Sequence, residues 1–268
     1  MAEEGNLIQY AVEDGIARIV LADAARLNAL SIDLQRELLA ALGKVRADVS
    51  VRAVLMSAAG KAFCVGADLG SLGTAAPGET VGGQTERMMR ELTNPIVQQI
   101  HELPVPVVCA VQGAVAGAGV GLALAADVVV AARSAYFYLP FMPKLGLVPD
   151  AGSTWFTSRL LGRARATALA LLGDRLGAEQ AEAWGLIACC VADDQLADKA
   201  LDMARRLAAL PALGVQEIRR AFDAAQNNDL AAQLDHEARR QHELIDRDTF
   251  QEGVKAFFEK RPPRFPSR

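Results

Sequence analysis

The chain has 268 residues, of which 51 % are hydrophobic and 22 % are charged, as is usual for a globular protein with a sizeable core. The net charge of −4 gives none of the basic excess that nucleic-acid-binding proteins carry. No apolar run reaches the roughly 18 residues that a membrane-spanning helix needs. The acidic start, MAEEG, is unlike a signal or transit peptide. We therefore expect a cytoplasmic protein that binds neither nucleic acid nor membrane.

The four cysteines form no C-x-x-C pair, and the three histidines form no cluster with them. Buried, unreactive thiols in a reducing compartment fit this pattern, and no metal site is predicted.

The N-terminal part of the chain predicts alternating strands and helices. Apolar–polar alternation indicates two strands within 7–22, joined by a turn at Asp14-Gly15. Ser31 is placed to cap a helix whose apolar residues recur at spacings of three and four. The further expected elements are a strand at 51–56, a glycine-containing loop at 57–69, a surface segment or lid at 71–83 and a helix at 84–102.

The stretch 106–154 contains the densest group of glycines between apolar runs. A strand candidate at 107–111 enters the glycine-rich loop 113–121, and a second strand candidate follows at 128–132. The stretch ends in Pro149-Asp150-Ala151-Gly152, a turn with one carboxylate. Glycine allows the backbone to approach a ligand closely, and a helix start leaves backbone N–H groups unpaired. This region therefore predicts a site in which backbone N–H groups bind an oxygen atom of a ligand. Tight helix–strand packing is the alternative, and the spacing matches neither a dinucleotide fingerprint nor a P-loop.

The C-terminal part of the chain changes character near residue 195. Helices are expected at 153–161, 163–172 and 178–184, followed by a last strand at 186–192. Beyond Gln195 the apolar residues follow only a helical period. We therefore predict an α/β core domain over 1–195 and a helical region over 196–268.

Several separate motifs resemble the enoyl-CoA hydratase/isomerase (crotonase) superfamily. They are LNALS at 27–31, GKAFCVGADL at 60–69, AVQGAVAGAGVGLALAAD at 110–127, KLGLVPDAGST at 144–154, ALLGDRLGAEQAEAWGLI at 170–187 and FFEKRPPRF at 257–265. The resemblance covers nearly the whole chain in order. It implies a crotonase-like spiral of β-β-α units with a C-terminal helical trimerisation region, assembled as a homotrimer or a dimer of trimers.

The resemblance also implies an acyl-CoA thioester substrate and no separate cofactor, since coenzyme A is part of the substrate. The amides of Ala67 and Ala118 would form an oxyanion hole for the thioester carbonyl. Lys61 and, from a neighbouring subunit, Lys260 would bind phosphates of coenzyme A, with plain solvation as the alternative for both. The other residues expected to line the substrate site are Leu27, Ala29, Leu30, Ala62, Asp68, Leu69, Gly117, Gly121, Phe141 and Met142.

The chain departs from the hydratases of this superfamily at two positions. Those enzymes use two glutamates, which would fall where this chain has Gly121 and Met142. One acid remains in the region, Asp150, and related isomerases place a catalytic carboxylate at this turn. An apolar wall over 137–142 would raise the pKa of Asp150 by desolvation and suit it to proton transfer. The alternative is that Asp150 caps the following helix.

We therefore predict an acyl-CoA isomerase that uses an oxyanion hole and a single aspartate. Within the superfamily, the runs 113–155 and 160–187 resemble isomerases that act on an epoxide of an aromatic acyl-CoA and on Δ3-enoyl-CoA. The alternatives are an enoyl-CoA hydratase or another reaction of the superfamily, and an acyl-CoA-binding subunit without catalytic activity.

Overall fold

The computed structural model describes residues 6–68, 70 and 78–266. The predicted hairpin opens the fold: β1 (Ile8–Glu13) and β2 (Ile16–Leu21) pair antiparallel around Asp14 and Gly15, which both have positive φ. The predicted cap of α1 (Ile32–Ala47) is present, since the Ser31 hydroxyl accepts a hydrogen bond from the Leu34 N–H at 3.2 Å. Strand β3 (Ala53–Ala58) then returns parallel to β2.

The helix expected at 84–102 is interrupted. It consists of α2 (Val81–Met88), the π-helical turn η2 (Met89–Thr93) and α3 (Asn94–Glu102). Pro95, at the start of α3, has no N–H with which to continue the helical ladder, which accounts for the break. The surface segment predicted at 71–83 was drawn too long, because 81–83 belong to α2 and residues 71–77 lie outside the described residues.

Six strands form the main sheet in the order β1-β2-β3-β4-β6-β9. Its remaining members are β4 (Val107–Val111), β6 (Val128–Ala132) and β9 (Cys189–Val191), each parallel to its neighbour. The central strands are almost wholly apolar and buried, as a parallel sheet with both faces covered requires. Strand β9 is shorter than the strand expected at 186–192.

A second, three-stranded sheet was not predicted. It contains β5 (Ala114–Ala116), β7 (Tyr136–Tyr138) and β8 (Leu176–Gly177). Strands of two or three residues are too short to show an alternating pattern, so the sequence carried no signal for them.

The glycines of the central stretch set the helix boundaries that follow. Helix α4 (Ala118–Leu124) begins directly after Gly117, and the π-helical turn η3 (Phe141–Leu145) precedes the acidic turn. Helix α5 (Ser153–Leu172) has a break at Gly162, as the two predicted helical pieces required. Helix α6 (Ala178–Trp184) ends at Gly185, which takes the left-handed conformation that glycine favours.

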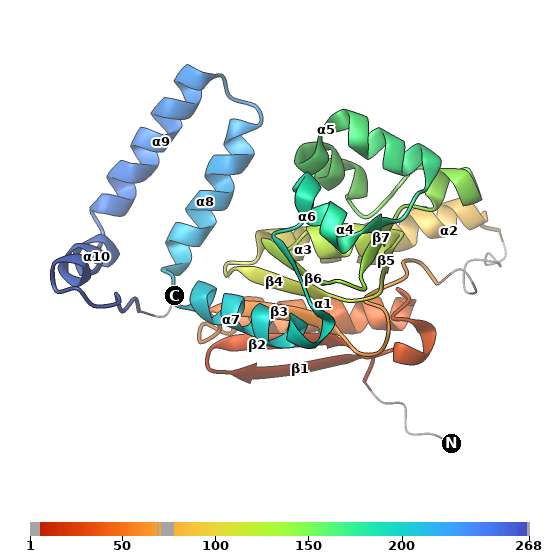
Figure 1. Ribbon diagram of the computed structural model, residues 1–268, viewed down its shortest axis with the longest axis horizontal. Helices are drawn as coiled ribbons and strands as arrows, with labels where there is room; N and C mark the ends of the chain where they lie inside the picture. Colours follow the sequence, from red (N-terminus) through yellow and green to blue (C-terminus); the bar gives the residue numbers. More distant parts are fainter. Residues whose placement is uncertain (1–5, 69, 71–77, 267–268) are drawn as a thin grey trace.

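Helix α7 (Leu196–Ala208) lies against the main sheet (Figure 1). Its buried face consists of Leu196, Ala200, Ala204 and Ala208, which pack on residues of β2, β3, β4 and β6. The predicted boundary at 195 separates the strands from the C-terminal helices, but α7 still covers the sheet. The helices that stand apart from the sheet begin after α7, with α8 (Ala212–Ala225), α9 (Leu230–Ile245) and α10 (Asp248–Phe258) (Figure 1).

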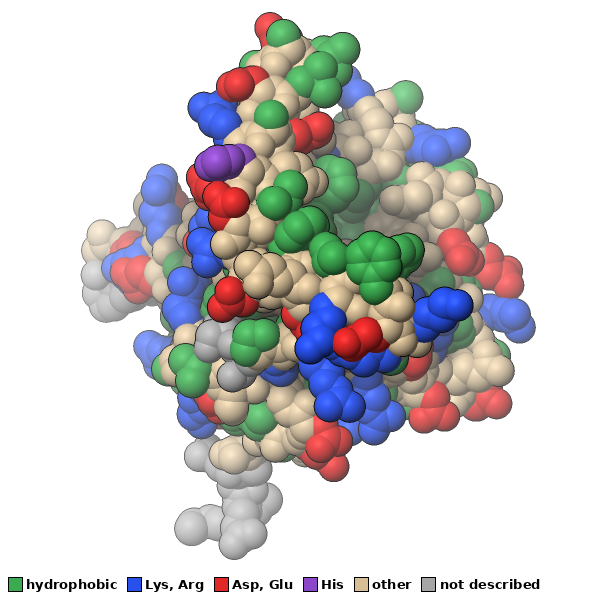
Figure 2. All heavy atoms as spheres, turned by 90° about the vertical axis from the view of Figure 1, so that its left-hand side faces the viewer, with side chains coloured by type: hydrophobic (Ala, Val, Ile, Leu, Met, Phe, Trp, Pro, Cys, Tyr) green, Lys and Arg blue, Asp and Glu red, His purple; other side chains and the backbone are tan. Residues whose placement is uncertain are grey.

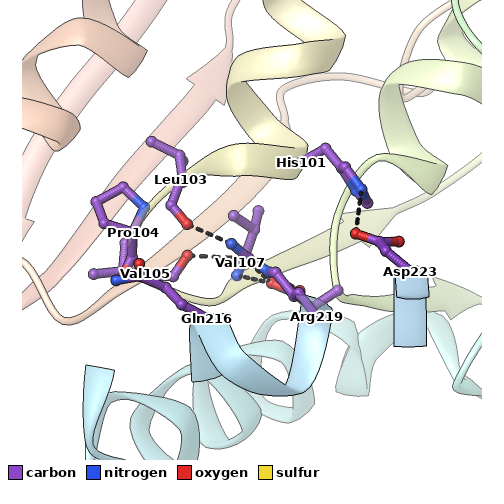
Figure 3. Close-up of polar contacts among 9 residues, drawn as sticks. His101, Leu103, Pro104, Val105, Val107, Gln216, Arg219 and Asp223 are labelled. Carbon is purple, nitrogen blue, oxygen red and sulfur yellow. Dashed lines mark hydrogen bonds and ion pairs between the residues drawn. The ribbon is translucent and has the colours of Figure 1, made fainter. Parts of the chain in front are cut away.

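Arg219 fastens α8 to the core (Figure 3). Its guanidinium donates to the backbone carbonyls of Leu103 and Val105 and forms an ion pair with Asp127. Asp127 also accepts from the Val107 N–H at 2.7 Å, so a single carboxylate joins α8 to the start of β4. Among the helices that the structure describes, none has the length and apolar character needed to cross a membrane.

Candidate active site

The two loops that were expected to carry oxyanion-binding amides meet in the structure. Gly66 has φ +89, and a Cβ atom added to it would lie 3.0 Å from both the Ala116 carbonyl oxygen and the Ala118 nitrogen. The Ala116 N–H donates to the Cys64 carbonyl at 2.9 Å. The loop after β3 therefore lies directly against the start of α4, and a side chain at position 66 would separate them.

The two amides have no other acceptor. Within the described ranges, neither the Ala67 N–H nor the Ala118 N–H donates a hydrogen bond to a protein group. Ala118 is the first residue of α4, where no intrahelical acceptor exists. Gly117 before it has φ 55 and ψ −131, a conformation that essentially requires glycine. Two backbone donors from adjoining loops are thus left without an acceptor among the described residues.

The segment 27–30 is tied to the loop 59–66 by an asparagine that the sequence reasoning passed over. Asn28 is fully buried, and its side-chain amide donates to the carbonyls of Ala59 at 3.0 Å and Ala62 at 2.9 Å. Leu30 adds a bond from its N–H to the Gly66 carbonyl at 2.8 Å. An asparagine flanked by apolar residues in LNALS was the available signal, because such a residue must find partners when buried. The segments that contain Leu27, Ala29, Leu30 and Ala62, all expected to line the substrate site, therefore lie together.

Gly121 brings the acidic turn to the same place. A Cβ atom added to Gly121 would lie 1.9 Å from the carbonyl oxygen of Ala151 and 3.1 Å from its Cβ atom. Gly121 follows Ala118 by three residues in α4, which is a rise of about 4.5 Å along a helix axis. The turn that holds Asp150 thus packs on α4 less than one helical turn past the Ala118 amide.

Asp150 does not cap the following helix. The N-cap residue of α5 is Gly152, and the Ser153 N–H bonds the backbone carbonyl of Asp150, at 2.8 Å, rather than its carboxylate. The buried Oδ1 atom of Asp150 has no hydrogen-bond partner among the described residues. Ala151 beside it is held at φ 49, a backbone conformation that non-glycine residues seldom adopt.

Burial makes this carboxyl a weak acid. Desolvation raises the pKa of Asp150 from 3.8 to about 6, and a hydrogen bond within the same residue opposes the shift. A carboxyl with a pKa in this range can both take up and release a proton near neutral pH. A buried carboxyl with one unpaired oxygen and a raised pKa has the properties of a general acid–base.

The predicted apolar wall is present in part. Phe137, Leu139 and Phe141 are buried, and the Phe141 ring lies near the α4 start, since its Cζ atom is 3.9 Å from a Cβ atom added to Gly117. Met142 is 41 % exposed and so contributes less to the burial of this region than was expected.

A cavity of about 170 Å³ lies next to Ala67. One wall consists of Leu30, Ile32, Gln35, Arg36, Ala67 and Asp68, and the other of Gln84, Arg87, Met88, Glu91 and Leu92 from α2 and η2. The carboxylate of Asp68 accepts from the Gly70 N–H at 3.2 Å. Leu69, the next predicted site residue, lies outside the described residues.

The two predicted phosphate-binding lysines are far apart. Lys61 is exposed on the loop after β3, and no ion pair to it occurs within the part of the chain that the structure describes. Lys260 follows α10, which stands with α8 and α9 apart from the sheets and α4 (Figure 1). Within a single chain, Lys260 therefore does not lie beside the other predicted site residues.

No group of His, Cys, Asp and Glu suited to a metal ion occurs among the described residues, and the four cysteines are free.

Comparison with known proteins identifies the class to which this fold and site belong. The family model for enoyl-CoA hydratase/isomerase matches residues 11–268. The chain is 43 % identical over 256 residues to the 1,2-epoxyphenylacetyl-CoA isomerase of Escherichia coli, covering 95 % of this chain and 96 % of that protein. It is also 43 % identical over 261 residues to a Rhodobacter capsulatus protein named as a probable enoyl-CoA hydratase, covering 97 % and 98 %.

Solved structures agree with this result. A Mycobacterium abscessus protein assigned as an enoyl-CoA hydratase/isomerase superposes with a TM-score of 0.90 at 38 % identity, over 97 % of this chain and 100 % of that one. The chain therefore belongs to the enoyl-CoA hydratase/isomerase family and has the crotonase fold. It is an enzyme of the crotonase superfamily that acts on coenzyme A thioesters.

Proposed function

We propose that this protein is an acyl-CoA isomerase in which Asp150 moves the proton. The observation that carries the proposal is the Asp150 carboxyl itself, half-buried beside α4, with an unpaired Oδ1 atom and a pKa of about 6. An oxygen atom of the carboxyl that no described protein group binds is available to a substrate.

In the proposed mechanism the amides of Ala67 and Ala118 bind the thioester carbonyl oxygen. Asp150 removes a proton from the carbon next to the carbonyl, and the C–H electron pair moves into an enolate whose oxygen the two amides stabilise. The same carboxyl then returns the proton to the γ carbon, and the double bond shifts from Δ3 to Δ2. No atom is gained or lost, so a single acid–base group is sufficient.

Hydration needs more groups than this site offers. A hydratase of the family must position water and move its proton, and it uses two glutamates for that purpose. Here the two positions are Gly121 and Met142, and Gly121 is packed against the Ala151 backbone with no room for a side chain. This packing favours isomerisation over the hydratase alternative.

We infer that the substrate is an aromatic-derived acyl-CoA, 2-(1,2-epoxy-1,2-dihydrophenyl)acetyl-CoA, with Δ3-enoyl-CoA as a second substrate. Two observations support this. The E. coli relative carries that activity in its name and is 43 % identical along nearly the whole chain. The ring of Phe141, near the α4 start, offers apolar contact to a bulky acyl group.

The test compares Asp150→Asn with Asp202→Asn, a change at an exposed aspartate of α7, on the epoxide and on a Δ3-enoyl-CoA, with products identified by mass spectrometry. We expect the Asp150 variant to lose at least about 100-fold in kcat, and the Asp202 control to stay within a few-fold of wild type. Turnover of the Asp150 variant within a few-fold of wild type would exclude Asp150 as the acid–base.

The two alternatives give different results in the same assay. Rapid loss of the enoyl absorbance of crotonyl-CoA would indicate a hydratase. Tight binding of acyl-CoA without turnover of any thioester would indicate a binding subunit.

We also propose assembly as a homotrimer or a dimer of trimers. Figure 2 shows hydrophobic side chains gathered on the face that α8, α9 and α10 present. The exposed apolar side chains of these helices are Ile218, Phe222, Leu230, Leu234, Ile245, Phe250, Val254, Phe257 and Phe258. An apolar surface of this extent is unusual on a monomer. Light scattering on the eluted protein should give a mass of about three or six times the chain mass of 28.5 kDa, and a monomer would contradict the proposal.

A further inference from the structure

Two buried polar side chains meet between α1 and η2, beside the cavity that Ala67 lines. Gln35 of α1 is 1 % exposed, and its Oε1 atom accepts a hydrogen bond from the Thr93 hydroxyl at 2.6 Å. Both side chains also contact the Met88 sulfur, at 3.5 and 3.4 Å. Thr93 is the buried residue of the π-helical turn η2, a geometry that is frequent at functional sites.

The pair continues into the loop that carries one oxyanion-binding amide. The Gln35 side-chain amide donates to the Leu30 carbonyl at 2.9 Å. The N–H of the same residue, Leu30, donates to the Gly66 carbonyl at 2.8 Å. Leu30 and Ala67 form an isolated parallel β-bridge. A continuous series of hydrogen bonds therefore runs from Thr93 through Gln35 and Leu30 to the residue that precedes Ala67.

These bonds fix the direction of the Ala67 N–H. The peptide plane between Gly66 and Ala67 contains both the Gly66 carbonyl, which Leu30 holds, and the Ala67 N–H. Rotation of that plane would break the Leu30 bond and change the direction of the Ala67 N–H. Because an oxyanion donor is useful only when it is aimed at the developing charge, the orientation of this plane matters to catalysis.

Stability alone does not require polar groups here. A buried hydrogen-bonded pair adds little net stability over apolar side chains of similar shape. Leu34 and Leu38 of α1 are buried in the main core, whereas Gln35 lines the cavity beside Ala67. A methionine at 35 and a valine at 93 would fill similar volumes without a polar partner.

We infer that Gln35, held by Thr93, is a positioning residue that aims the Ala67 amide at the thioester carbonyl. The inference rests on the proposed function to the extent that the Ala67 and Ala118 amides form the carbonyl-binding site. It gives the polar pair between α1 and η2 a role in the chemistry, although neither side chain touches the reacting atoms.

The experiment measures carbonyl recognition directly. Calorimetry gives the dissociation constants of saturated hexanoyl-CoA, which has the thioester carbonyl, and of S-hexyl-CoA, a thioether that lacks it. The ratio of the two constants reports the carbonyl contact and needs no turnover. The variants are Gln35→Met, Thr93→Val and the conservative Thr93→Ser. The matched control is Gln216→Met, because Gln216 also donates to a backbone carbonyl, that of Pro104, but on α8 away from the site.

We expect Gln35→Met to reduce the thioester preference about 10-fold and kcat by a similar factor, with the affinity for the thioether unchanged. Thr93→Val should have a smaller effect in the same direction, and Thr93→Ser should restore the wild-type ratio. Gln216→Met should leave the ratio unchanged. If Gln35→Met does not fold, the comparison of Thr93→Val with Thr93→Ser provides the test.

A thioester preference within 2-fold of wild type in Gln35→Met, or in Thr93→Val where Gln35→Met does not fold, would overturn the inference. Equal weakening of both ligands would also overturn it, because a general loss of structure does not discriminate between them. A wild-type protein with no thioester preference would overturn the carbonyl site of the proposed function and this inference with it. A wild-type protein that has the preference but does not isomerise would contradict only the proposed reaction.

Discussion

The backbones of Gly121 and Ala151 are in direct contact, and a Cβ atom at position 121 would overlap the Ala151 carbonyl oxygen at 1.9 Å. Helix α4 and the turn before α5 therefore use the same space that a longer side chain at 121 would need. Since Ala151 follows Asp150, the packing that excludes a glutamate at 121 also holds the remaining carboxylate beside the α4 start. The contact between Gly121 and Ala151 therefore both leaves no space for a glutamate at position 121 and fixes the position of Asp150.

Gly121→Glu is therefore expected not to create a hydratase. The new side chain must displace the Ala151 backbone, and overpacking of this kind costs about 3 kcal/mol or more. We predict a large fall in Tm and loss of isomerase activity, with no hydration of crotonyl-CoA. Gly43→Glu is the matched control, because Gly43 lies in α1 with no atom within 4 Å of an added Cβ. Hydratase activity in a stably folded Gly121→Glu protein would contradict this interpretation of the packing.

The pH dependence of the isomerase should reflect the raised pKa of Asp150. The carboxyl must be ionised to remove a proton, and desolvation raises its pKa to about 6. We predict that kcat/KM rises with pH through about 6 and reaches a plateau above about 7. A profile measured between pH 4.5 and 8 tests this, and activity that is constant over that range would indicate that another group carries the proton.

The same shift predicts how stability depends on pH. Because the folded protein holds the Asp150 proton more tightly than the unfolded chain, the favourable contribution is fully present below about pH 4 and is lost as pH rises through about 6. Asp150→Asn removes the buried charge, so the variant should be more stable than wild type at pH 8 by on the order of 2 kcal/mol. Urea unfolding at pH 8 and pH 4 tests this, and the difference between the two proteins should shrink at the lower pH. A variant less stable than wild type at pH 8 would show that the carboxylate has a structural partner.

The sequence predicted the long elements well, because their signals are local. The Ser31 cap, the Asp14-Gly15 hairpin and the break at Gly162 each depend on a few neighbouring residues. The strands β5, β7 and β8 form through pairing with distant segments, and two or three residues carry no periodic pattern of their own. Helix α7 was assigned to the C-terminal region because its sequence is helical, and its packing on the sheet could not be inferred from that fact.

In the candidate site, too, local motifs were predicted and contacts between distant segments were not. Ala67, Ala118 and Asp150 were predicted from motifs, and the structure adds the contacts between the segments that carry them. That Gly121 meets Ala151, and that Asn28 bonds Ala59 and Ala62, are relationships between residues remote in sequence.

Asn28 provides the last test, because it joins the two segments expected to line the coenzyme A channel. Its side-chain amide donates hydrogen bonds to the buried Ala62 carbonyl and the partly buried Ala59 carbonyl, and its φ of 55 suits asparagine or glycine. Asn28→Ala leaves the carbonyls unpaired and strains the backbone, so we predict a loss of about 2 to 4 kcal/mol in the free energy of unfolding. Asn28→Gly removes the same bonds but tolerates the φ, so the difference in the free energy of unfolding between the two variants measures the backbone strain.

Both variants should raise KM for acyl-CoA more than they lower kcat, because the segment 27–30 is loosened while Asp150 stays in place. Unchanged KM in a destabilised Asn28→Gly protein would show that segment 27–30 does not contact the substrate.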